Sequence, residues 1–490
     1  MSIQRQVTPM TAPRGPVTAR LGRRSERGVM WGLSAGQLIA VGAAAALVGP
    51  AAMSAGLTGL LVTAPGWVAA LVFAFVRPRG KTVAAWTPVV ANWMVRRIGG
   101  QTRWLARPGQ LRPAGTLALP GEVASLRVYV HTSSGTAMIH DPHRRTLTGV
   151  IRLSHPSFPL LSPDEQNRRV TAWGSVLSGA CRTGHVCGLQ LVERTLPDHG
   201  DAVQAHWHHH GYDGTGLAAD SYRALIASAG PASARHETLM ALTLSLKAAA
   251  AAIRSSGRGV AGAAHVLMKE LTTVAASLRT AELGVEGFLS EDELARVIDT
   301  AFTSRPPATE GSGTGVAVDV AGPVGVATEW DHVRIDDGWH AVLWVREWPR
   351  QDVDASFLTP LMLTNTVRRT ISLFYRPRTT RQALKELRTE QAEQESEQRR
   401  RDKHDIRTTA AQQREQEDID RRERELVVGH ADLPYTGLIA VSGSTREDLD
   451  EAVAEVESAC HQCGLDTSLL VGQQDAAFYA AALPLGRLPL

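Results

Sequence analysis

The stretch GVMWGLSAGQLIAVGAAAALVGPAAMSAGLTGLLVTAPGWVAALVFAFV, residues 28–76, contains no Asp, Glu, Lys, Arg or His. A helix needs about 20 apolar residues to cross the hydrocarbon core of a bilayer, so this stretch is long enough for two crossings. Proline disfavours helix at the residue before it, which places the predicted break at Gly49-Pro50. We therefore predict a transmembrane hairpin with spans over about residues 29–48 and 57–76.

Basic residues lie on both sides of this hairpin, and positively charged flanks stay in the cytoplasm. We therefore expect a multi-pass plasma-membrane protein with both termini cytoplasmic and its lipid contacts in the bilayer. A cleaved signal peptide is the alternative, but its apolar region would run over only about 7–15 residues. The flanking residues expected to anchor the hairpin are Arg23, Arg24, Arg27, Arg77, Arg79 and Lys81.

The whole chain has 490 residues, of which 43% are hydrophobic and 21% charged, with a net charge of +3. This length allows two or three domains, and the small net charge predicts no direct nucleic-acid binding. Four cysteines in so long a chain argue against a disulfide scaffold and favour a reducing compartment.

The rest of the chain predicts a membrane-anchored α+β protein. Alternating apolar runs predict strands at 126–130, 137–139, 146–153 and 186–192, whereas residues 232–302 read as mainly helical. Ser162 and Ser290 begin helices with capping boxes, and a third box at Ser444 begins a helix that ends at Gly464. A helix from Trp86 to Ile98 should lie against the membrane surface, and the tryptophans of 329–348 should pack in cores or interfaces.

Two longer patterns complete this reading. Residues 381–428 are dominated by Arg, Glu and Gln without heptads, which predicts a long charged helix, as an extended arm or a helical hairpin. The helix–Gly–strand pattern at Gly184 recurs at Gly464, and two such units would form ferredoxin-like layers. The predicted parts are a basic cytoplasmic tail (1–27), the transmembrane hairpin (28–76), a juxtamembrane helix and linker (77–120), an α+β subdomain (121–230), a helical subdomain (231–304), a loop (305–328), a Trp-rich strand region (329–380), the long charged helix (381–428) and a C-terminal βαβ unit (429–490).

Motifs that would carry chemistry are incomplete. Gly80-Lys81-Thr82 resembles the end of a phosphate-binding loop, but Phe75 stands where its first glycine should be. The histidines of 206–210 are adjacent and converge poorly on one metal, so a polar surface segment is favoured. Cys460 and Cys463 share one helical face and read as core residues. We expect no enzyme, and therefore no catalytic residue, cofactor or metal.

Three stretches carry a family resemblance: WDHVRIDDGWHAVLWVREWPR (330–350), FLTPLMLTNTVRRTISLFYRP (357–377) and RERELVVGHADLPYTGLIAVSG (422–443). They resemble actinobacterial membrane proteins associated with conjugation or type IV secretion-like systems. The soluble part is also similar to the non-motor N-terminal region of conjugation ATPases, through Gln473-Gln474, Ala477-Phe478 and residues 483–486. The hairpin resembles the two-helix membrane subunit fused to such ATPases. The motor domain of these relatives has no counterpart here, so nucleotide hydrolysis is not carried over.

The resemblance implies a non-enzymatic docking component that anchors a separately encoded motor ATPase and other membrane subunits in an oligomeric assembly. Apolar residues are dense near the end of the sequence, and exposed apolar clusters often mark partner sites. The alternative for this tail is that it packs on its own βαβ unit. One alternative is a type VII secretion component resembling EccE proteins, which also carry two N-terminal spans and a cytosolic domain. Another is a membrane-bound enzyme of unknown reaction. The residues expected to dock the ATPase are Phe478, Tyr479, Leu483, Leu485 and Leu488.

Overall fold

The computed structural model describes residues 35–76, 82–106, 115–154, 158–197, 207, 216–229, 234–303, 320–349, 351–364, 366–403, 417, 419–424 and 432–488. Several predictions fall outside these ranges. They concern the anchoring residues Arg23, Arg24, Arg27, Arg77, Arg79 and Lys81, residues 305–319 of the loop, and the four histidines of 206–210.

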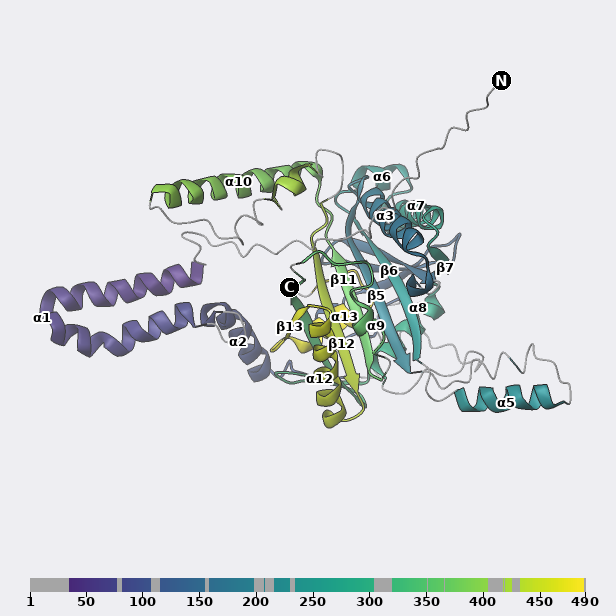
Figure 1. The fold of residues 1–490 in the computed structure, drawn as a ribbon, viewed down its shortest axis with the longest axis horizontal. Coiled ribbons are helices and arrows are strands. Elements are labelled where there is room, and N and C mark those ends of the chain that lie inside the picture. The colour runs from purple at the N-terminus through teal and green to yellow at the C-terminus, as the bar shows by residue number, and fades with distance from the viewer. Residues whose placement is uncertain are drawn as a thin grey trace, which may run out of the picture.

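Helix α1 (Ala35–Phe75) is apolar along its whole length and reverses direction at Gly56. Figure 1 shows its two arms side by side, and Gln37 Nε2 donates to the carbonyl oxygen of Ala74 at 2.9 Å. The predicted break at Gly49-Pro50 is wrong, because Pro50 lies inside the helix and the reversal uses Gly56, whose φ of 52° suits glycine.

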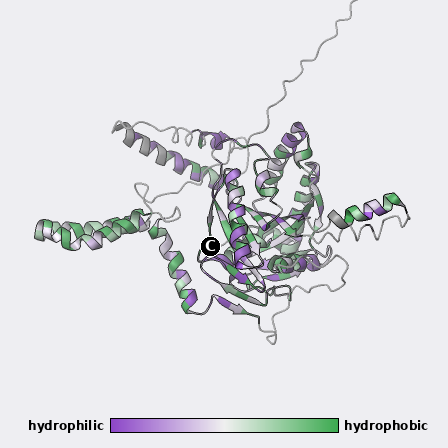
Figure 2. Ribbon diagram, turned by 60° about the horizontal axis from the view of Figure 1, so that its bottom comes forward, coloured by the Kyte–Doolittle hydropathy of each residue, from purple (hydrophilic) through white to green (hydrophobic). Residues whose placement is uncertain are grey.

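By length and composition, the segment Gly36–Phe75 of α1 could cross a membrane, and it is the one such helix in the described residues. Its apolar side chains are mostly uncovered; Met53, for example, is 91% exposed. Figure 2 shows α1 as hydrophobic, in contrast to the charged helix α10. The helix is therefore not a core element of the folded domain.

Helix α2 (Val83–Ile98) follows α1 and is capped by Thr82, whose side chain accepts a hydrogen bond from the Ala85 amide. The stretch after α2 is more ordered than the predicted linker. Strand β1 (Arg103–Leu105) pairs with β8, and Leu117 and Leu119 are buried in the core. Apolar side chains that find a sheet to cover thus turn part of the linker into structure.

In the described residues the domain is built on one antiparallel sheet of 13 strands, which confirms the α+β prediction. The strand order is β1-β8-β9-β10-β12-β11-β5-β6-β4-β3-β2, with β13 beside β10 and β7 beside β4. The sheet runs across the predicted boundaries at residues 230, 328 and 380. The strands are β1 (Arg103–Leu105), β2 (Arg127–Val130), β3 (Ala137–Asp141), β4 (Thr146–Ser154), β5 (Val186–Pro197), β6 (Ala234–Ser245), β7 (Gly284–Phe288), β8 (Gly325–Thr328), β9 (Val333–Ile335), β10 (Gly338–Glu347), β11 (Arg368–Tyr375), β12 (Tyr435–Gly443) and β13 (Asp466–Leu469).

The sheet contains two ferredoxin-like units of the βαββαβ type. The first is β4-α3-β5-β6-α7-β7 and the second β10-α9-β11-β12-α12-β13. Their strand orders are β7-β4-β6-β5 and β13-β10-β12-β11, so each position of one unit has its counterpart in the other. The predicted ferredoxin-like layers are present, but the helix–strand pair at Gly464 corresponds to α7-β7 and not to the pair at Gly184. The helices are α3 (Pro163–Cys181), α7 (Gly259–Thr280), α9 (Thr359–Met362) and α12 (Arg446–Gln462).

The two units join through their outer strands, with β5 and β11 paired from Arg369–Thr195 to Tyr375–Leu189. Each unit carries an insertion between its second and third strands. The first contains α5 (Leu217–Ala229) and the second contains α10 (Thr380–Lys403). Because β5 and β11 run in opposite directions, the two insertions leave the sheet at opposite ends, as Figure 1 shows.

The charged region contains the predicted long helix, and a second helical piece lies beside it. Helix α10 covers Thr380–Lys403, and the helical residues 419–424 lie against its first half. Arg422 Nη1 donates to Glu390 at 3.2 Å, and Leu384 and Ile419 pack on one small core.

Helices cover both faces of the sheet. On one face α3 and α7 cover the first unit and α12 covers the second. On the other face α8 (Glu291–Phe302) and α13 (Gln474–Ala482) share one core, in which the rings of Phe302 and Phe478 lie 6.1 Å apart. Helix α8 follows β7 as α13 follows β13, so these helices extend the internal repeat. The predicted capping boxes at Ser162 and Ser290 are confirmed, whereas the third uses Thr445 in place of Ser444.

Candidate functional site: the junction of helix α2 with the sheet

Helix α13 lies over β10, β11, β12 and β5, at the seam between the two units. Its apolar residues face the core, and Phe478 is only 1% exposed. The expectation of an exposed docking cluster is therefore wrong, since a short helix that is apolar all round is buried by its own domain. The side chains of Phe478, Tyr479, Leu483 and Leu485 are buried, and Leu488 is partly buried against the same core.

Polar groups fix α13 and the segment after it to the sheet. Gln190 Nε2, on β5, lies 2.9 Å from the Ala480 carbonyl oxygen and 3.0 Å from that of Leu483. Its Oε1 accepts from the Gly486 amide at 2.8 Å, and Ser372 on β11 donates to the Ala481 carbonyl at 2.6 Å. One buried amide and one hydroxyl thus satisfy the backbone at the end of α13.

Helix α2 contacts the other end of α13. Arg96 donates to both carboxylate oxygens of Asp475, with Nη1 3.2 Å from Oδ1. Burial lowers the pKa of Arg96, but the hydrogen bond and charge of Asp475 outweigh it and raise the pKa overall. Asp475 lies in the first turn of α13, where a negative charge is favoured by the helix dipole. The ion pair therefore ties α2 to α13 and, through it, to the centre of the sheet.

An aromatic contact lies beside this ion pair. The rings of Trp93 and Trp330 meet edge to face at 5.0 Å, and the Arg97 guanidinium lies 4.8 Å from the Trp93 ring centre. Gly472 has a φ of 75°, and a side-chain carbon there would come within 2.8 Å of the Trp330 ring. A glycine is thus needed for the tryptophans to meet, and Trp330 fulfils the expected interface role.

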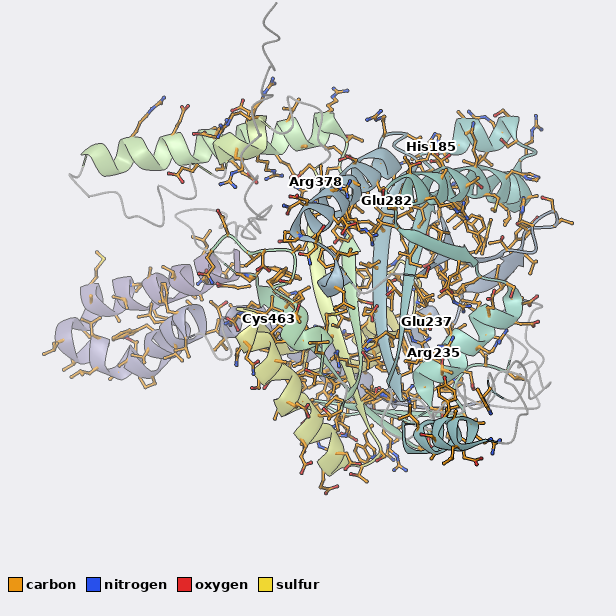
Figure 3. All side chains as sticks on the ribbon, turned by 45° about the vertical axis from the view of Figure 1, so that its right-hand side comes forward. His185, Arg235, Glu237, Glu282, Arg378 and Cys463 are labelled. Atoms are coloured by element: carbon orange, nitrogen blue, oxygen red, sulfur yellow. The ribbon has the colours of Figure 1, made fainter. Side chains whose placement is uncertain are left out.

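Buried cations lie at the end of α8. Arg368 donates to the carbonyl oxygens of Thr300 and Thr303, while Arg194 binds Glu237 at 3.0 Å and the Thr300 hydroxyl at 2.8 Å. Glu237 projects from β6 at the middle of the sheet (Figure 3). Burial, together with Arg194, lowers the pKa of Arg368 to about 10. The two guanidinium groups stabilise the negative end of the α8 dipole, and Glu237 compensates the charge of Arg194, which is a structural use.

A groove of about 930 Å³ lies between α3 and α7. At its edge His131 Nε2 is 3.0 Å from His265 Nδ1, and burial and His265 lower the pKa of His131. The hydroxyls of Thr272, Thr273 and Ser277 bond to carbonyls of their own helix. The groove therefore presents mainly methyl groups, and neither histidine was singled out from the sequence.

Three other predicted features have clear places. Thr82, from the incomplete phosphate-loop motif, caps α2. Cys460 and Cys463 are buried in the α12 core, as expected for small core residues, and burial raises the pKa of Cys460 to about 12. Trp207, beside the histidines, contacts Tyr222 at 4.9 Å between ring centres. In the described part of the chain, no three His, Cys, Asp or Glu side chains gather in a metal-binding group.

A comparison with known families concerns the second half of the first unit and the start of the second unit. Residues 232–345 match the family model EccE, described as "Putative type VII ESX secretion system translocon, EccE". The chain is similar to EccE over this segment. No curated protein matches the chain.

The EccE match runs from β6 through α7, α8 and most of β10, and includes Trp330. It supports a membrane component of a secretion system and favours the type VII alternative over the conjugation resemblance. Helices α1, α2 and α13 lie outside the match, so the junction itself is characterised by geometry alone. Arg96 lies near the end of the helix predicted over Trp86–Ile98, but its partner Asp475 is 379 residues away, and the sequence did not predict the pair.

Acid should destabilise the protein partly through His340, which lies under α13. Its Nδ1 is 2.8 Å from the Ser442 hydroxyl, its ring is 4.3 Å from that of Phe478, and burial and Arg368 lower its pKa to about 3. Between pH 6 and 3.5 the unfolded chain binds this proton and the folded chain does not. Stability should therefore fall by about 1.4 kcal/mol per pH unit from this group alone.

The test compares urea unfolding of the detergent-solubilised protein and its His340→Asn variant at pH 7, 5 and 4. The variant should lose less stability on acidification, whereas the exposed control His461→Asn should follow the parent protein. Parallel losses in all three proteins would show that His340 is not responsible.

Proposed function

We propose that this protein is a structural membrane component of a type VII secretion translocon, without enzymatic activity of its own. In this proposal α1 crosses the plasma membrane twice, and both termini and the sheet lie in the cytoplasm. Its partners are the other membrane subunits and the motor ATPase of the same complex. Support comes from the EccE similarity, from the basic residues on both sides of α1, and from four cysteines that are all unpaired.

The observation that carries the proposal is the junction of α2 with α13. It connects an apolar helix that the domain does not bury to the seam of a large rigid sheet. A scaffold needs such a connection, because a domain held by a loose linker would not keep its place in an assembly. The buried charges favour the same reading, since Arg194, Glu237 and Arg368 bind one another or a helix end.

The experiment is recovery of the assembly from native membranes through a tag on this protein. We expect an ESX-type ATPase and the neighbouring membrane subunits to be recovered with it. Arg96→Asp should reduce this recovery at least fivefold, because two carboxylates would then face each other at the junction. The charge swap Arg96→Asp with Asp475→Arg should restore it.

Membrane retention and the unfolding midpoint of each variant serve as controls for folding. Recovery of a conjugation-type motor would replace the type VII assignment with the type IV alternative. Recovery of the protein alone would rule out a stable translocon component. The purified protein should also show no ATP or GTP hydrolysis above background.

A further inference from the structure

Charge is distributed unevenly between residues 77–121, which follow α1 and contain α2 and β1, and the rest of the chain. Residues 77–121 contain eight Lys or Arg and no Asp or Glu. Residues 122–490 contain 38 Lys or Arg against 48 Asp or Glu. The stretch directly after α1 is thus strongly cationic, while the chain that follows is acidic. Runs of four to eight cations beside a membrane helix are typical of segments that bind anionic lipids.

Helix α2, within that cationic stretch, has two different faces. At 100° per residue, Val89, Trp93 and Arg96 share one face, and this face contacts Trp330, Gly472 and Asp475 of the domain. The opposite face carries Ala91, Met94, Val95 and Ile98, all exposed; Ile98 is 87% exposed. The domain therefore covers one face of α2 and leaves an apolar face uncovered.

This uncovered face continues in sequence into the edge strand β1. Only four residues separate Ile98 from Arg103, and Leu105 at the end of the strand is 74% exposed. Arg97 and Arg103 are also exposed, so cations accompany the apolar side chains. Apolar groups bordered by cations are the composition of helices that lie in the headgroup layer.

The position of α2 brings this surface to the base of α1. The Val83 amide donates to the Val76 carbonyl at 3.1 Å, and Gly36 at the start of α1 lies against Ala84. Both ends of α1 therefore meet the first turn of α2, as Figure 1 shows. If α1 spans the bilayer, α2 begins at the headgroup level of the leaflet that α1 enters.

We propose that α2 and β1 form a binding surface for anionic phospholipids, with Met94, Val95 and Ile98 at the acyl boundary and Arg97 and Arg103 on the phosphates. The proposal rests on the membrane crossing by α1 that the proposed function includes. It adds a lipid partner and a headgroup preference. The acidic domain is kept from the anionic surface by repulsion, while Arg96 and Asp475 hold it to α2.

The experiment places the photo-crosslinker benzoylphenylalanine at Ile98 in the full chain, reconstituted in nanodiscs. The matched control carries it at Leu160, which is 85% exposed on the first unit. Discs contain phosphatidylcholine alone or with phosphatidylglycerol, and mass spectrometry detects lipid adducts. We expect adducts at position 98 and not at 160, with a several-fold higher yield in the anionic discs.

Charge reversal tests the headgroup preference. Arg97→Glu or Arg103→Glu should each lower the adduct yield in anionic discs about fivefold, whereas Arg279→Glu on α7 should leave it unchanged. Equal yields at 98 and 160, or equal yields in both kinds of disc, would overturn the proposal. The same crosslinker at position 98 can be used in native membranes. Adducts there to protein, and not to lipid, would make this face a subunit interface instead. If the full chain did not enter the discs at all, that result would contradict the membrane crossing by α1 on which the proposed function depends.

Discussion

Replacing Phe478 by alanine is expected to lower the free energy of unfolding by about 4 kcal/mol. The ring is fully buried at the seam of the two units, 4.3 Å from His340 and 6.1 Å from Phe302 between ring centres. Its removal would leave a cavity bordered by α8, α13 and β10, which are held by other contacts and cannot close around it. The loss would affect both ferredoxin-like units, because their cores meet at this residue.

Urea unfolding of the detergent-solubilised protein, followed by tryptophan fluorescence, measures this loss. Leu488→Ala is the matched control, because Leu488 packs on the edge of the same core and is only partly buried. It should cost well under half as much. An unchanged urea midpoint for Phe478→Ala, together with loss of binding to a membrane partner, would show that Phe478 belongs to a docking surface after all.

Replacing Gln190 by leucine is expected to cost about 3 kcal/mol or more, although leucine is apolar and similar in size. The side chain is fully buried and serves the carbonyls of Ala480 and Leu483 and the amide of Gly486. Leucine would remove the bonds to the Ala480 carbonyl and the Gly486 amide in a place that water does not reach, while the Leu483 carbonyl would keep its bond from the Leu485 amide. Each unsatisfied buried group costs about 1–3 kcal/mol.

A second substitution at this position gives a test through pH. In Gln190→Glu the introduced carboxyl is buried, so its pKa in the folded state is raised above the unfolded value of about 4.3. The stability of this variant relative to the parent protein should therefore fall as pH rises above about 4, while near pH 4 the two proteins should be similarly stable. Urea midpoints at pH 4, 5.5 and 7 measure this, with exposed Gln462→Leu as a neutral control. An unchanged midpoint for Gln190→Leu at pH 7 would show that the network carries little energy.

Local signals in the sequence predicted local structure well. Ser162 and Ser290 begin their helices as expected, because a side chain that caps its own helix needs no distant partner. The strands at 127–130, 137–141 and 146–154 also follow their alternating patterns closely. In contrast β6 was read as part of a helical region. It is buried on both sides between β4 and β5, so its apolar run does not alternate.

These local signals could not predict the junction of α2 with α13. Pairing of Arg96 with Asp475 and of Trp93 with Trp330 depends on how distant segments meet, which periodicity does not encode. The apolar residues of α13 were visible in the sequence, but their density fits an exposed surface or a core equally well. These residues are buried because α13 covers the seam between the two units, and this seam forms only when β5 and β11 pair.

The link between β5 and α13 also sets an order of events during synthesis. Gln190 can form its hydrogen bond to the Ala480 carbonyl only after a further 290 residues have been synthesised. At about 5–20 residues per second, a ribosome needs about 15–60 s to reach that carbonyl after making Gln190. Helix α1 emerges long before, so the membrane insertion proposed for it would take place while the first unit is still open along its outer strand. An open strand edge attracts other chains, and a chaperone that covers β5 until β11 has paired with it would protect the nascent protein from aggregation.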